Sequence, residues 1–363
     1  MIRWHGFLKA MGMILLMGGL TGCWDQHPVD TRAAIAAIGI DPGPAPGEQR
    51  YVFVFPNVTT TAGSLSSISP SRQFYTIPVV ATGLLAALAT AQRQESRTLY
   101  LGQVRILYLS TKLSTKVWRR TLVTMADSGR FVLTTWVVAA PNASRAVSVV
   151  SPVEVVPEVG LYNALVCHCQ NIRWPGRGWR VWAAVATPGI SPAVVRAIPV
   201  QDRFRLSNIA VLGAHHVVLW PSAATLGWAY LTGRVTQGAM TVRVGHARRD
   251  VGLIRGTRQL RFVTHGSHVT ALLHLDYTGV LFSVPGGTDS VRQNRAVEAA
   301  VVKQIQNDMQ AAWAEAQQSQ TDPMGWHRDA GWSGLPVTQT ITWRHWSWAA
   351  TVNFTLREEG ILR

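Results

Sequence analysis

The stretch from residue 289 to residue 318 constrains the fold of this chain most, because it has the pattern of one long amphipathic helix. Large apolar side chains recur there every four residues, which places them on one face of a helix. The members of this stripe are Val297, Val301, Ile305, Met309 and Trp313. Val302 and Ala316 widen the stripe, and Asp289 is a suitable N-terminal cap. A stripe of this kind is typical of a helix that packs on a sheet.

Strand patterns precede and follow this helix in the sequence. Residues 238–283 are rich in β-prone side chains. At the C-terminal end, apolar Val352, Phe354 and Leu356 alternate with polar residues, which is the period of a half-buried strand. We therefore expect the long C-terminal helix to lie against an antiparallel sheet.

The first part of the chain alternates strand and helix patterns. Residues 34–41 and 51–56 are β-prone runs separated by a loop of prolines and glycines, which predicts a hairpin. Residues 79–92 have helical spacing, and Ser114 is a suitable cap for a second helix.

Two more strands are expected in this part of the chain, over residues 103–109 and 131–140. The second run is apolar on both faces, as in a central strand. The order of elements predicts an α+β fold with mixed sheets packed with helices.

A domain boundary is expected near residue 200. Residues 171–180 are rich in Arg, Gly and Trp, and residues 188–199 hold three prolines, which is typical of a linker. This gives domains over residues 23–200 and 201–363, with the option of dividing the second again near residue 245. Beyond the boundary, residues 207–213 and 216–220 predict another hairpin, followed by a helix that Ser222 is placed to cap.

The N-terminus has the pattern of an export signal. Arg3 and Lys9 precede an apolar run over residues 10–20, and Leu20-Thr21-Gly22-Cys23 follows. The run is short for a membrane-spanning helix, which needs roughly 20 apolar residues. The ending is similar to the bacterial lipobox, which implies a signal peptide over residues 1–22 and lipidation of Cys23. Acyl chains on Cys23 would anchor the protein to membrane lipid.

The charge is strongly basic, with 34 Lys and Arg against 19 Asp and Glu and a formal net charge of +15. Such a surplus favours anionic surfaces such as acidic lipid headgroups or wall polymers. Nucleic acid is not expected as a partner, because the basic residues are scattered and the protein is exported. A general bias of composition towards Arg explains the surplus equally well.

No metal or other cofactor is expected. Cys167 and Cys169 have no second pair of ligands, and residues 157–170 have the spacing of a helix in which Cys169 is a core residue. The pairs His265 with His268 and His215 with His216 also lack an obvious third ligand.

The chain is not expected to be an enzyme. Strong catalytic motifs are absent from the sequence, and Asp127, Glu154 and Glu158 share no spacing that suits a pair of catalytic carboxylates. Residues 175–178, Pro-Gly-Arg-Gly, look like a phosphate loop but lack the Lys-Ser that completes one.

Several motifs, taken in order, resemble the Ger(x)C family of spore germination lipoproteins. They are Gly-Cys-Trp-Asp at 22–25, Ile-Gly-Ile-Asp at 38–41, Tyr-Leu-Gly-Gln at 100–103, the unit 208–233 ending in Leu-x-Gly, and Thr-Asp-Pro-Met-Gly at 321–325. The chain departs from the family at Gln103, where His is usual, and in its 15 tryptophans and few acids.

This resemblance implies a non-catalytic C subunit of a nutrient germinant receptor. Its partners would be an A-type and a B-type membrane subunit, and its place the outer face of the cytoplasmic membrane, which is the spore inner membrane. Cys23 is the functional position that carries over from the family. The alternative is an extracellular solute-binding or cell-wall-associated lipoprotein.

Overall fold

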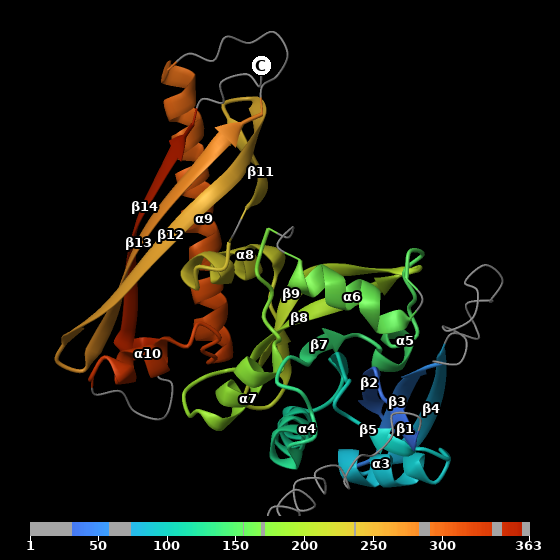
Figure 1. Ribbon diagram of the computed structural model, residues 1–363. Helices are drawn as coiled ribbons and strands as arrows, with labels where there is room; N and C mark the ends of the chain where they lie inside the picture. The colour runs from blue at the N-terminus through green and yellow to red at the C-terminus, as the bar shows by residue number, and fades with distance from the viewer. Residues whose placement is uncertain are drawn as a thin grey trace, which may run out of the picture.

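The computed structural model describes residues 31–57, 74–154, 156–167, 171–235, 237–282, 291–335 and 343–357. These residues form the predicted α+β fold of mixed sheets packed with helices (Figure 1). The predicted signal peptide, Cys23, Cys169 and the expected helix cap Asp289 lie outside the described residues.

The largest element is an eight-stranded sheet with the order β10-β9-β8-β7-β6-β2-β3-β4. Its strands are β2 (Ala37–Pro42), β3 (Gln49–Pro56), β4 (Phe74–Ala81), β6 (Ile106–Ser110), β7 (Trp136–Ala140), β8 (Ala193–Val200), β9 (Arg203–Leu212) and β10 (Val217–Leu219). The neighbours β2, β6, β7 and β8 are parallel, while β3, β4, β9 and β10 add antiparallel at the two edges. A separate parallel pair joins β1 (Arg32–Ala34) to β5 (Thr98–Tyr100). The hairpins predicted at β2–β3 and at β9–β10 are confirmed.

Helices cover both faces of this sheet. They are α3 (Leu84–Gln92), α4 (Thr115–Ser128), α5 (Ala143–Ala146), α6 (Pro157–Val166) and α7 (Gly178–Ala186). One core lies under α3 and α4, where Trp118, Leu122 and Met125 of α4 are buried. Helix α4 begins at the predicted cap, because the Ser114 hydroxyl accepts a hydrogen bond from the Val117 N–H at 3.4 Å.

Several expected element bounds are wrong, including the start of the strand expected over residues 103–109, which begins at Ile106. The helix expected from residue 79 begins only at Leu84, because Val79 and its neighbours pair with β3 as strand β4. The helix expected to reach residue 170 ends at Val166, and Cys167 already has extended backbone. The strand expected from residue 131 begins at Trp136.

The C-terminal part is a four-stranded sheet with the long helix packed along it (Figure 1). The strands are β11 (Gly238–Val244), β12 (Ala247–His265), β13 (His268–Leu281) and β14 (Trp346–Leu356), and the helix is α9 (Val291–Ser319). All five residues of the predicted stripe are buried, with exposures of 0 to 5%. The sheet is antiparallel from β11 to β13, as predicted. Strand β14 then adds in parallel to β13, because α9 carries the chain back to the same end of the sheet.

A short helix, α8 (Ser222–Leu231), joins the two parts. It packs closely on α9 through Gly227, where a side chain would overlap the carbonyl group of Asp308. Ser222 is the first residue of α8 and not its cap, since Pro221 holds the cap position without a side-chain hydrogen bond. One buried cluster runs from Val54 and Val138 of the large sheet through Trp228 to Val352 of β14.

Residue 200, where the domain boundary is expected, is the last residue of β8, directly before the turn into β9 of the large sheet. Residue 245 likewise lies in the turn between β11 and β12. The two-domain division remains a prediction, and the described sheet is continuous across residue 200. Within the described residues, no helix combines the length and apolar character that a membrane crossing needs.

Candidate functional site

A cavity of about 720 Å³ lies where the large sheet, α7, α8 and α10 (Trp326–Trp332) meet. Its wall carries six arginines, which are Arg173, Arg177, Arg180, Arg234, Arg258 and Arg328. Among the described residues that line the cavity, Asp329 is the only one with a carboxylate. Four tryptophans, Trp136, Trp174, Trp179 and Trp228, also line it. The cavity is therefore both electropositive and aromatic.

Hydrogen bonds to the backbone hold one side of the cavity, because they join two segments that are 61 residues apart in the sequence. The Arg173 N–H donates to the carbonyl of Arg234 at 2.8 Å, and a bridge pairs Ile172 with Val235. In return the Arg234 Nη1 donates to the Arg173 carbonyl at 3.2 Å. Arg173 and Arg234 are thus fixed next to each other despite their like charge.

The Pro-Gly-Arg-Gly segment at 175–178 forms another side. Gly176 has φ of +132°, and its carbonyl accepts from the Val137 N–H of β7 at 2.7 Å. The Gly178 N–H donates to the Thr135 carbonyl at 2.6 Å. Because these N–H and C=O groups bind β7 and Thr135 directly before it, the segment does not have the free N–H groups of a phosphate loop. Its role is to place Arg177 and Arg180 at the cavity.

Four arginines stack on tryptophan rings. The guanidinium carbons of Arg177, Arg180 and Arg234 lie 5.8, 4.9 and 5.2 Å from the ring centroids of Trp136, Trp179 and Trp228. Arg328 lies 4.5 Å above the ring of Trp332. Stacking on an aromatic face holds a guanidinium in place while its in-plane N–H donors stay available.

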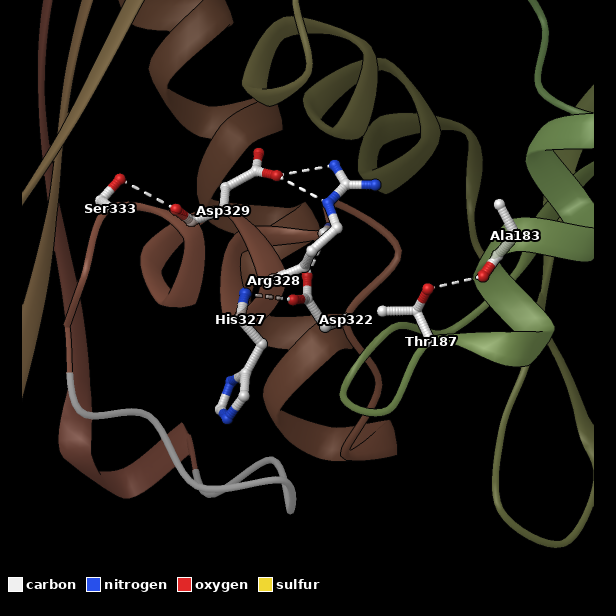
Figure 2. A network of polar contacts seen from close by, with 8 residues as sticks. Ala183, Thr187, Asp322, His327, Arg328, Asp329 and Ser333 are labelled. Atoms are coloured by element: carbon white, nitrogen blue, oxygen red, sulfur yellow. Dashed lines mark hydrogen bonds and ion pairs between the residues drawn. The ribbon is translucent and has the colours of Figure 1, made fainter.

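The charges in the cavity are poorly balanced. Arg328 donates to Asp329 Oδ1 through Nε at 2.8 Å and Nη2 at 2.6 Å, so the carboxylate in the wall is already paired (Figure 2). Burial, with the charges of Arg180 and Arg173, lowers the pKa of the Arg234 guanidinium to about 10. Burial also lowers the pKa of Arg258. Five arginines thus share a confined space without an ion-pair partner among the described residues.

Asp322 fixes the loop that closes the cavity before α10. Its carboxylate accepts from the backbone N–H of His327 at 2.8 Å (Figure 2) and from that of Gly325 at 2.8 Å. The Asp322 N–H donates to the Ser191 hydroxyl at 3.0 Å. Burial raises the pKa of the Asp322 carboxyl to about 6, even though the backbone donors favour the charged form. Since all these partners are backbone groups or Ser191, Asp322 has a structural role.

The other residues considered from the sequence do not gather into a site. His265 and His268 face each other across the β12–β13 turn, and His268 Nε2 lies 3.0 Å from the Ser347 hydroxyl. Within the described residues, no group of three or more His, Cys, Asp or Glu side chains is placed to hold a metal ion. Cys167 is disulfide-bonded, so its sulfur is not a thiolate ligand.

Glu158 is buried in α6, where burial raises its pKa. It lies close enough to Glu154, another of the acids considered, for the charge of Glu154 to add to this rise in its pKa. It is not among the residues that line the cavity.

Residues 25–195 match the family model described as "Spore germination protein N-terminal domain". Over residues 25–195 the chain belongs to the Ger(x)C family of spore germination proteins. Its fold resembles that of the GerBC protein in a crystal structure, with a TM-score of 0.54 and 10% sequence identity over 88% of this chain and 97% of that one. No curated protein sequence matches the chain. The resemblance inferred from the sequence motifs is thereby confirmed.

This germination family comprises C subunits of germinant receptors and is not a known enzyme family. Two of the motifs that identified it have clear structural roles. Ile-Gly-Ile-Asp lies in β2, and Asp41 holds the first turn of α5 by accepting from the N–H groups of Ala143 at 2.9 Å and Ser144 at 2.6 Å. Thr-Asp-Pro-Met-Gly forms the Asp322 loop at the cavity.

The arginine cavity itself was missed by the sequence argument. The Arg, Gly and Trp content of residues 171–180 predicts a linker, yet this content is the main sequence signal for the site. Arg234, Arg258 and Arg328 reach the cavity only through the fold, and their sequence positions give no sign of it.

Proposed function

We propose that this protein is a non-catalytic, lipid-anchored C subunit that assembles with A-type and B-type membrane subunits in a spore nutrient germinant receptor. The observation that carries the proposal is the match of residues 25–195 to the spore germination domain. That domain starts two positions after Cys23, the residue expected to bear the lipid.

The short distance between Cys23 and the folded body supports a position close to the membrane. The first described strand, β1, starts at Arg32. An extended chain spans at most about 3.5 Å per residue, so these nine residues reach no further than roughly 30 Å. A body held in such a thin layer meets membrane partners at a high effective concentration.

The disulfide at Cys167 supports export of the protein. Disulfides persist in oxidising compartments outside the cytoplasm. Together with the lipobox this favours the outer face of the cytoplasmic membrane, which becomes the spore inner membrane.

Two observations support a role without catalysis, namely the family of the matched domain and the separation of the buried acidic side chains. The buried acids with raised pKa values, Asp308, Asp322 and Glu158, lie in separate elements. Exposed aromatic side chains offer surface for partners instead, with Trp332 77% and Trp179 45% exposed.

The experiment that tests this proposal is deletion of the gene, followed by a germination assay with a panel of nutrients. Loss of the response to one set of nutrients, with other responses intact, is the expected result. The chain is then restored with Cys23 intact or as Cys23→Ala. Normal germination of the deletion strain with every nutrient would refute the proposal and favour the solute-binding or wall-associated alternative.

A further inference from the structure

We propose that the arginine-lined cavity is a binding site for a small organic anion that carries at least two carboxylate or phosphate groups. The proposal does not depend on the receptor assembly and concerns the isolated chain. It starts from the charge of the wall, where six guanidinium groups meet one carboxylate.

The first step is the availability of hydrogen-bond donors. The side chains of Arg177 and Arg180 make no hydrogen bond or ion pair with the described residues, and each is held by stacking on a tryptophan. A guanidinium fork presents paired N–H groups that match the geometry of a carboxylate or phosphate. Both arginines are exposed, so a soluble anion reaches them.

The second step is the shortage of acceptors deeper in the wall. The Nε of Arg258 and the indole Nε1 atoms of Trp136 and Trp174 are buried and have no acceptor among the described residues. Buried donors normally have a partner. These buried donors lie behind the cavity surface and add to its positive potential, which favours an anion over a cation.

The third step is the size and lining of the space. The volume of about 720 Å³ is in the range of small-molecule sites, and a smaller cavity of about 290 Å³ shares Arg173 and Arg258 with it. Four tryptophans supply apolar surface between the charges. Arginines on several sides of the space fit an anion with more than one charged group.

Fixed arginines of like charge also indicate a site. Arg173 and Arg234 are held together by backbone hydrogen bonds, and Arg258 contacts the same turn at Gly233. A bound anion relieves their mutual repulsion. It would therefore stabilise the junction between the large sheet and the C-terminal part.

The test is calorimetric titration of the purified full chain, in a neutral detergent at low salt, with citrate and separately with pyrophosphate. We expect saturable binding of about one anion per chain for at least one probe. The probe that binds distinguishes a carboxylate site from a phosphate site. The variant Arg177→Gln with Arg180→Gln should weaken binding about tenfold or more, since it removes two charge-assisted contacts.

The matched control is Arg243→Gln with Arg248→Gln, which removes the same charge from a cross-strand pair of exposed arginines on the β11–β12 hairpin. It should leave the affinity within about twofold. Far-UV circular dichroism and the urea midpoint check that both variants fold. Absence of saturable binding by both probes, or equal weakening by the control, would overturn the proposal.

Discussion

The contact between α8 and α9 holds the two parts of the molecule together, and Gly227 is its closest point. A Cβ at this position would overlap the backbone carbonyl of Asp308 and lie 2.9 Å from the Cβ of Ala312. That carbonyl is in the interior of a long helix and cannot turn away. Carbon–oxygen contacts are normally at least about 3.3 Å, so Gly227→Ala must push the helices apart by roughly 1 Å or more.

The expected result is a net destabilisation. Alanine favours a helix interior over glycine by about 1 kcal/mol. Overpacking a tight contact costs about 1–3 kcal/mol and sometimes more. Because backbone meets backbone here, we expect the upper end, and hence a loss of about 2 kcal/mol in the free energy of unfolding. At roughly 2–4 °C per kcal/mol this lowers the Tm by about 4–8 °C.

The assay is urea unfolding followed by far-UV circular dichroism, with Gly83→Ala as control. Gly83 stands before α3 with φ of −173°, and a Cβ there meets nothing within 4 Å. The control should lower the free energy of unfolding by no more than about 1 kcal/mol, the cost of alanine in place of glycine at a helix N-cap. A Gly227→Ala protein as stable as the wild type would refute the argument that this contact sets the helix spacing.

Other predictions concern the anchor, one buried acid and the cysteines. Cys23→Ala should move the protein out of the membrane fraction, and a variant that stays there in high salt would contradict a lipid anchor, because salt releases electrostatic attachment. Burial raises the pKa of the Asp308 carboxyl from 3.8 to about 6. The buried carboxyl group therefore contributes stability in its neutral form below pH 4, and this contribution is lost as the pH rises through 6. Asp308→Asn keeps an oxygen that accepts the hydrogen bond from Gln304. In urea titrations this variant should be more stable than wild type by about 1–3 kcal/mol at pH 7.5, and equally stable near pH 4. A difference in stability that does not change with pH would exclude this cause. Elemental analysis should find well under one zinc per chain, and stoichiometric zinc that disappears in Cys167→Ser with Cys169→Ala would show the no-metal prediction to be wrong.

The parts of the fold that the sequence predicts are those with a strict local pattern. The α9 stripe is buried along its whole length because a four-residue repeat faces one side of a helix. Ser114 caps α4 because its hydroxyl needs only the next turn of its own chain. In each case the deciding contact is within a few residues or is forced by periodicity.

The errors come from contacts between distant segments. Val80 has helical spacing with Leu84 and Leu88, yet pairing with β3 keeps it in a strand. The alternation in β14 identifies a strand but not its partner, and the strand proves to be parallel to β13. The arginine cavity is the same kind of case, since Arg177, Arg258 and Arg328 meet only in the folded chain.

The measurement that tests the central claim most directly is a pull-down of the tagged full chain from spore inner membranes, with mass spectrometry of the proteins that accompany it. We expect one A-type and one B-type receptor subunit in amounts similar to the chain itself. Both subunits should co-purify with the wild-type chain. The Cys23→Ala chain, which leaves the membrane, should recover much smaller amounts of them. Recovery of an ATP-driven permease with the wild-type chain, and of neither receptor subunit, would contradict the account.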